Sequence, residues 1–252
     1  MNRNIILPNI ITGLNFLFGI FALILIFNED FIPASICIFI AMICDLLDGQ
    51  VARRNNATSH FGMEFDSLSD LVSFGIAPGM LLFAFHLHEL NELGIFIVSV
   101  YILSCGIRLA RFNVNAKPSA KNVFTGLPSP AAAGLICSSL ILVTKYNSIF
   151  FLKLLPATVL TAGILMLSSI KYPVPVGFIY FMKNKITGWP RLAFMGLGAV
   201  LLFTRTEILL YAVFAIYVTF GITRAVLQYA PNRLPRKASL RIKKPHRSSK
   251  NR

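Results

Sequence analysis

Four aspartates, an arginine and three small residues recur at fixed intervals in one stretch of this 252-residue chain. The pattern reads D-x2-D-G-x2-A-R-x8-G-x3-D-x3-D, and the residues that fill it are Asp45, Asp48, Gly49, Ala52, Arg53, Gly62, Asp66 and Asp70. On a helix, residues three or four positions apart share a face. Each of two successive helices is therefore predicted to present a pair of carboxylates.

This set of side chains suits a divalent cation and an anionic ligand. Carboxylate oxygens favour Mg²⁺ or Mn²⁺, and less often Ca²⁺, whereas zinc is disfavoured because no His or Cys joins them. Two such ions about 3.5–4 Å apart can stabilise both sides of a phosphoryl displacement. Gly49 and Ala52 leave room for a bulky group, and Arg53 could meet an anionic oxygen. Ion or proton transport is the alternative, since transport pathways also use intramembrane aspartates.

The composition places these acids in a membrane protein. Hydrophobic residues make up 56% of the chain, charged residues 13%, and the mean hydropathy is +0.69. An all-α polytopic bundle is predicted, with about eight transmembrane helices in one domain, residues 1–230, and a basic tail, residues 231–252. The predicted spans are residues 10–27, 31–47, 66–87, 93–112, 130–145, 149–169, 189–203 and 208–227.

Acids at these positions are costly. One aspartate at the centre of a membrane helix costs about 2.5–3.5 kcal/mol, so four without partners would cost on the order of 10 kcal/mol on the same scale. Bound divalent cations would offset that cost.

The distribution of basic residues predicts the orientation. With eight spans, 21 of the 24 Lys and Arg residues fall on the side of the N-terminus. Both termini and the aspartate-rich segment are therefore predicted to face the cytoplasm, with the chain as a multi-pass protein of the cell membrane.

The first predicted span has a polar face formed by Asn9, Thr12 and Asn15. Such side chains either hydrogen-bond a neighbouring helix or line the same cavity as the acids. Both interpretations remain open from the sequence.

The eight positions of the motif match, without a departure, those of the CDP-alcohol phosphatidyltransferase family, which the chain resembles. The resemblance implies an integral membrane enzyme that transfers a phosphatidyl or similar group from a CDP-linked donor to an alcohol and releases CMP. It implies two metal ions held by the four aspartates, with Asp70 also the general base. The donor site that it implies, with the polar face of the first span added, comprises Asn9, Thr12, Asp48, Gly49, Ala52 and Arg53.

Three downstream segments, residues 73–82, 108–113 and 124–134, are similar to the membrane-bound phosphatidylserine synthases of that family. This similarity implies CDP-diacylglycerol and L-serine as substrates and a homodimer as the assembly. Glycerol-3-phosphate or inositol phosphate remains the alternative acceptor.

Serine carries both a carboxylate and an ammonium group. Arg108 and Arg111, three residues apart, are candidates to bind the carboxylate. The alternative is that they anchor their helix at anionic lipid head groups.

The tail from residue 231 holds nine Lys or Arg and no acid in 22 residues. It is predicted to be disordered and attracted to anionic membrane lipid. Nucleic-acid binding is disfavoured, because no aromatic platform or folded motif accompanies these charges.

Overall fold

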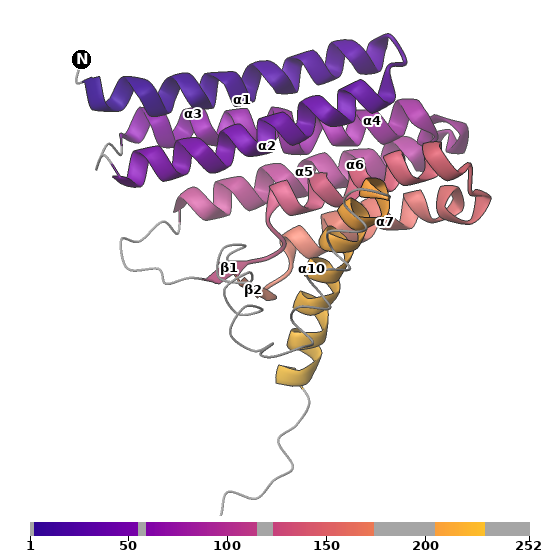
Figure 1. The fold of residues 1–252 in the computed structure, drawn as a ribbon. Helices are drawn as coiled ribbons and strands as arrows, with labels where there is room; N and C mark the ends of the chain where they lie inside the picture. Colours follow the sequence, from indigo (N-terminus) through magenta and orange to yellow (C-terminus); the bar gives the residue numbers. More distant parts are fainter. Residues whose placement is uncertain (1–2, 55–58, 115–122, 174–204, 230–252) are drawn as a thin grey trace, which may run out of the picture.

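A computed structural model of the chain describes residues 3–54, 59–114, 123–173 and 205–229, which form a helical bundle (Figure 1). The elements are α1 (Arg3–Phe27), α2 (Phe31–Arg54), α3 (His60–Asp70), the π-helix η1 (Leu71–Ile76), α4 (Ala77–Phe85), the 3-10 helix η2 (Leu87–Leu90), α5 (Glu92–Val114), β1 (Val123–Thr125), α6 (Ser129–Tyr146), α7 (Ile149–Leu167), β2 (Lys171–Pro173) and α10 (Thr206–Tyr229).

The expected polytopic helical fold is confirmed. Within the described residues, seven helical stretches are long and apolar enough to cross a membrane. One of them is composite, because α3, η1 and α4 together form the continuous stretch His60–Phe85. The predicted span at residues 189–203 lies outside the described residues.

Two helices extend further than the predicted spans. Helix α2 continues to Arg54, and α3 begins at His60, where the side chain of Ser59 accepts a hydrogen bond of 3.0 Å from the Gly62 N–H. This is an N-cap, which satisfies one of the free N–H groups at the helix start. Asp66 and Asp70 therefore lie in the second and third turns of a helix rather than at its first residue.

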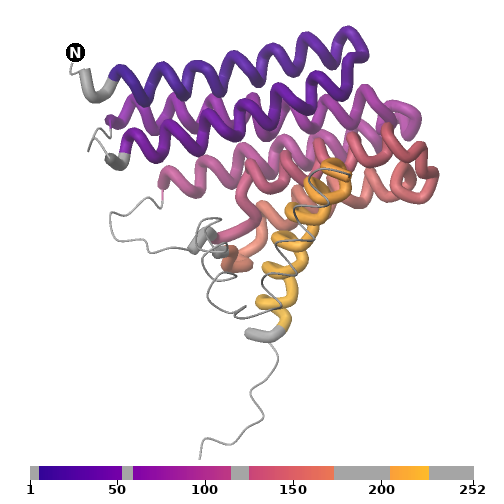
Figure 2. The backbone as a smooth tube through the Cα atoms, in the orientation of Figure 1, coloured from indigo at the N-terminus to yellow at the C-terminus, as the bar shows by residue number. Residues whose placement is uncertain are grey.

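The helices form one bundle that α10 crosses. Helix α1 packs against α2, α3, η1 and α4, while α5, α6 and α7 pack together on the other side of the bundle. In Figures 1 and 2 the orange-yellow α10 runs across the direction of the other helices. It packs on α6, where a Cβ added to Gly134 would lie 2.2 Å from the Phe214 ring.

A π-helix interrupts the third span directly after Asp70. Pro78 has no N–H, so it cannot donate to the carbonyl of Phe74 four residues earlier. That carbonyl instead accepts a hydrogen bond of 2.7 Å from the hydroxyl of Tyr101 on α5, which is fully buried. The proline and the tyrosine together account for the wider helical register at η1.

A short antiparallel pair of strands, β1 and β2, is an addition to the predicted helical fold. It joins the segment that follows α5 to the segment that follows α7, with Phe124 opposite Tyr172. Gly126, at φ 82°, ends β1 in a conformation that favours glycine, and its N–H donates to the Ile170 carbonyl at 2.8 Å. Burial raises the pKa of Tyr172 to about 12.

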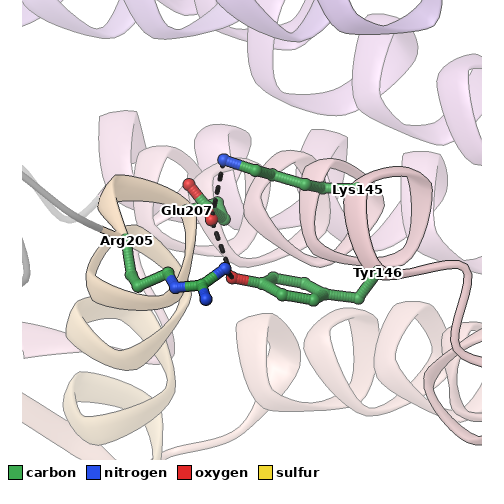
Figure 3. Close-up of polar contacts among 4 residues, drawn as sticks. All are labelled: Lys145, Tyr146, Arg205 and Glu207. Carbon is green, nitrogen blue, oxygen red and sulfur yellow. Dashed lines mark hydrogen bonds and ion pairs between the residues drawn. The ribbon is translucent and has the colours of Figure 1, made fainter.

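A polar cluster fixes the start of α10 to the end of α6 (Figure 3). Glu207 is 7% exposed, its carboxylate lies 2.9 Å from the Lys145 ammonium, and it accepts a hydrogen bond of 2.8 Å from the Tyr146 hydroxyl. Arg205 donates to the same hydroxyl at 3.1 Å and stands over the Tyr146 ring. Because Glu207 has both partners, its carboxylate is compensated at this end of the bundle.

Candidate active site

Three of the motif aspartates converge between α2 and α3. Asp45, Asp48 and Asp66 each offer a carboxylate oxygen, and these oxygens lie within 4.8 Å of one another. Asp48 is 6% exposed, and the other two are half-buried. The Oδ1 atom of Asp66 is buried and has no hydrogen-bond partner among the described residues. Clustered oxygen ligands with an unpaired atom fit a hard divalent cation.

Asp70 lies one turn beyond Asp66 and has a different environment. It is 8% exposed, and its Oδ1 accepts a hydrogen bond of 3.1 Å from the amide nitrogen of Asn15. It interacts electrostatically with Asp45 and Asp66, and with the guanidinium of Arg108. The structure therefore places Asp70 beside the three clustered carboxylates with an amide donor of its own.

The polar face of α1 supplies donors to these acids. The Thr12 hydroxyl lies 2.8 Å from Asp48 Oδ2 and 3.1 Å from the carbonyl of Pro8. A hydroxyl has one proton to donate. The carboxylate is the stronger acceptor and lies closer, so the Thr12 hydroxyl donates to Asp48. Thr12 and Asn15 thus hydrogen-bond neighbouring helices, and their partners are the site carboxylates. The interpretation as helix–helix hydrogen bonds is thus supported for Thr12 and Asn15, while the interpretation as a cavity lining stays a prediction.

Close contacts between α1 and the third span fix that polar face in place. Ser69 donates to the Thr12 carbonyl at 2.8 Å, and Ser73 donates to the Asn15 carbonyl at 2.9 Å. Gly19 allows this approach, because a Cβ there would lie 2.5 Å from the Ser73 hydroxyl oxygen. The main chain of α1 is therefore held at two points on either side of Asp70.

The remaining predicted donor-site residues lie around the same helix ends. A Cβ added to Gly62 would lie 2.9 Å from the Asn9 amide oxygen, so the Asn9 side chain lies against the start of α3. Gly49 and Ala52 are half-buried on α2. Arg53 belongs to α2, but its side chain lies outside the described part of the chain.

The two candidate serine-binding arginines have different surroundings in the structure. Arg111 donates to the carbonyls of Leu167 and Thr125 at 3.1 Å, and more weakly to the carbonyls of Met166 and Ser168 at 3.4 Å. These bonds tie α5 to the end of α7 and to β1. Arg111 therefore serves a structural purpose that neither sequence alternative included.

Arg108 points into the protein near Asp70. It is 7% exposed, and its Nη1 donates to the Ser129 hydroxyl at 3.0 Å. Its Nε is buried and has no hydrogen-bond partner within the described residues. Tyr217 of α10 also lies close enough for an electrostatic interaction with Arg108.

Sequence reasoning missed two groups of residues here. Ser129 has no motif of its own, because its partner Arg108 lies 21 residues earlier. Asn113 donates to Ser67 at 2.9 Å and to Glu64 at 3.3 Å, which links the end of α5 to α3. The spacing of Glu64 and Ser67 on one face of α3 was the available signal, but it does not identify the partner.

Fold and site together define a polytopic membrane protein whose helix ends form a carboxylate centre suited to divalent cations and phosphoryl chemistry. The family model for CDP-alcohol phosphatidyltransferase matches residues 5–168, a range that includes every residue of this centre. The chain belongs to the CDP-alcohol phosphatidyltransferase family.

Several named relatives are similar to the chain. A CDP-diacylglycerol--serine O-phosphatidyltransferase of Helicobacter pylori is 34% identical over 69% of this chain and 74% of its own length. One from Methanocaldococcus jannaschii is 35% identical over 77% of this chain and 90% of its own length. An archaetidylserine synthase of Methanothermobacter thermautotrophicus is 39% identical over 67% of this chain and 70% of its own length. Sequence similarity thus extends through most of the bundle.

Replacing Thr12 by Val tests the hydrogen bond to Asp48. We expect the affinity for Mn²⁺ to fall about 10- to 100-fold, because the carboxylate loses the donor that orients it. Titration of the purified protein with Mn²⁺, followed by electron paramagnetic resonance, measures this. Thr161→Val is the matched control, since that exposed hydroxyl bonds only within α7 among the described residues. Equal affinities in both variants would contradict an orienting role for Thr12.

Proposed function

We propose that the protein transfers the phosphatidyl group of CDP-diacylglycerol to the hydroxyl of L-serine, giving phosphatidylserine and CMP. The proposal rests mainly on the carboxylate oxygens of Asp45, Asp48 and Asp66, which lie within 4.8 Å of one another. Asp70 lies next to them and accepts a hydrogen bond from Asn15. The names of the similar proteins support the choice of serine. The match to a transferase family over residues 5–168 favours an enzyme over a transporter.

The four aspartates are proposed to hold two divalent ions, Mg²⁺ or Mn²⁺, with Ca²⁺ as a further candidate. When bound, these ions neutralise the diphosphate of the donor and the charge that develops on the departing CMP. The oxygen-only ligand set and the unpaired Asp66 atom support this assignment.

Asp70 is proposed to act as the general base. It accepts the proton of the serine hydroxyl as that oxygen forms a bond to the phosphorus that carries the diacylglycerol. The bond between this phosphorus and the bridging oxygen breaks, and its electron pair leaves with CMP. Asn15 holds one oxygen of Asp70, so the carboxylate keeps a fixed orientation toward the acceptor.

The donor and the acceptor are proposed to bind on different sides of Asp70. The donor side comprises Asn9 and Thr12 of α1 together with Asp48, Gly49, Ala52 and Arg53 of α2.

On the acceptor side we retain Arg108 as the partner of the serine carboxylate, since its buried Nε lacks a protein partner among the described residues. Arg111 is less suited, because several of its donors already meet carbonyls of α7 and β1.

The site is proposed to face the cytoplasm at the cell membrane, as the distribution of Lys and Arg indicates. This location lets the lipid tails of the donor stay in the bilayer while the polar groups react at its surface. The homodimer and the attraction of the basic tail to anionic lipid remain predictions from the sequence.

An acceptor panel tests the reaction. Purified protein in detergent, with CDP-diacylglycerol and Mn²⁺ or Mg²⁺, is expected to release CMP with labelled L-serine and to place the label in lipid. Glycerol-3-phosphate, inositol and inositol phosphate serve as the competing acceptors. Incorporation of another acceptor without serine would leave the chemistry in place and overturn the substrate assignment. Ion flux in sealed vesicles without CMP release would overturn both.

Asp70→Asn tests the general base. We expect CMP release to fall by at least about 10²-fold, because an amide cannot take the serine proton. Binding of CDP-diacylglycerol in the presence of Mn²⁺ should remain close to that of the wild type. Glu64→Gln, an exposed carboxylate on the same helix, is the control and should keep its rate. An equal loss of donor binding and rate in Asp70→Asn would argue against a base.

Arg108→Lys and Arg111→Lys form a matched pair that tests the acceptor side. Arg108→Lys is expected to raise the KM for L-serine about 10-fold or more, with little change in the KM for the donor, because lysine lacks the planar fork. Arg111→Lys is expected to lower the Tm instead, since it loses bonds to carbonyls of two elements. Steady-state kinetics and thermal unfolding in detergent measure the two effects. The reverse pattern would exchange the roles of the two arginines.

A further inference from the structure

One buried amide beside Asp70 has an unused acceptor. Asn15 is 0% exposed, and its Nδ2 donates to Asp70 Oδ1 at 3.1 Å. This orientation of the amide follows from chemistry, because a carboxylate accepts hydrogen bonds and needs the NH₂ group. The other end of the amide, Oδ1, is buried and has no hydrogen-bond partner among the described residues.

An unpaired amide oxygen in a protein interior is unfavourable, so a bound N–H or O–H group at this position would be stabilised. The contacts of Asn15 connect it to Asp70 rather than to the cluster of Asp45, Asp48 and Asp66. The unused acceptor thus belongs to the neighbourhood of the proposed base, where the acceptor substrate must place its hydroxyl.

We propose that Asn15 Oδ1 accepts a hydrogen bond from the ammonium group of the acceptor amino acid. This inference rests on the proposed function and adds a residue that sets the choice of acceptor. The ammonium of serine is attached to the carbon next to the one that bears the hydroxyl. A substrate whose hydroxyl meets Asp70 therefore brings its ammonium close to a side chain that is bonded to Asp70.

A second unpaired group, of opposite polarity and near Asp70, supports this assignment. Arg108 interacts electrostatically with Asp70 and has a buried Nε without a partner in the described part of the chain. An unpaired donor and an unpaired acceptor thus accompany the same carboxylate. They correspond to the carboxylate and the ammonium of a zwitterion, whereas glycerol-3-phosphate could offer Asn15 only a neutral hydroxyl and no cation.

The test compares L-serine with 3-hydroxypropionate, which is serine without the amino group. CMP release by the full-length protein with CDP-diacylglycerol and Mn²⁺ gives kcat/KM for each, and their ratio is the preference for serine. Asn15→Leu is expected to reduce this preference about 10- to 100-fold, the usual effect of losing a hydrogen bond to a charged group. Asn15→Asp keeps an oxygen acceptor, so its preference should be at least that of the wild type while both rates fall.

Ser73→Ala is the matched control. It removes the bond to the main-chain carbonyl of Asn15 and leaves the Asn15 side chain in place, so the preference should not change. An equal loss of kcat/KM for both acceptors in Asn15→Leu would show that Asn15 only positions Asp70, and would overturn the proposal. If Asn15→Leu does not fold, a reduced preference in Asn15→Asp overturns it as well. Absence of CMP release from the wild type with serine would instead overturn the proposed function together with this inference.

Discussion

Carboxylates inside membrane helices are unfavourable unless hydrogen bonds or positive charges stabilise them, and the rest of this structure depends on that constraint. Helix α1 belongs to the most apolar of the described spans, with a mean hydropathy of 2.5, yet it places Thr12 and Asn15 against Asp48 and Asp70. Those two contacts satisfy one oxygen each. The buried Asp66 oxygen receives no donor from the described residues, so a cation bound there would offset the cost of burying it. The donors of helix α1 and the proposed divalent ions thus compensate different carboxylate oxygens.

The position of Asp70 depends on an irregular helix as well as on the motif. The π-helix η1 begins at the next residue, and its presence is explained by Pro78, which leaves the Phe74 carbonyl without its usual donor. Tyr101 supplies the replacement bond from α5, and Ser73 within η1 reaches the main chain of α1. The irregular segment therefore connects the helix that carries Asp70 to both of its neighbours. A regular helix would direct the residues after Asp70 to other faces.

The sequence allowed the helical fold and the composition of the carboxylate centre to be predicted because both follow from local periodicity. Residues three and four apart share a helix face wherever the helix lies, so the pairing of Asp45 with Asp48 needed no tertiary information. The same spacing could not distinguish Arg108 from Arg111. The two arginines differ because Arg111 donates to carbonyls at the end of α7, and the Leu167 carbonyl is 56 residues away in the sequence. The pairing of β1 with β2 and the contact of Ser129 with Arg108 were not predicted either, because they also join segments far apart in the sequence. The π-helix η1 is different, because Pro78 is a local indication of an irregular helix.

The structure also suggests how a shared reaction is joined to a particular acceptor. The family match covers residues 5–168 and includes all four aspartates, but α10 lies beyond it. Helix α6 connects the two regions, because Ser129 at its start binds Arg108 and Lys145 near its end binds Glu207 of α10. From that anchor α10 brings Tyr217 within electrostatic range of Arg108. The residues proposed to bind the metal ions and the donor therefore lie in the part of the chain that the family model matches, while the surroundings of Arg108 include a helix outside it. Substitutions in α10 can then alter the surroundings of Arg108 without altering the carboxylate cluster, which lies between α2 and α3.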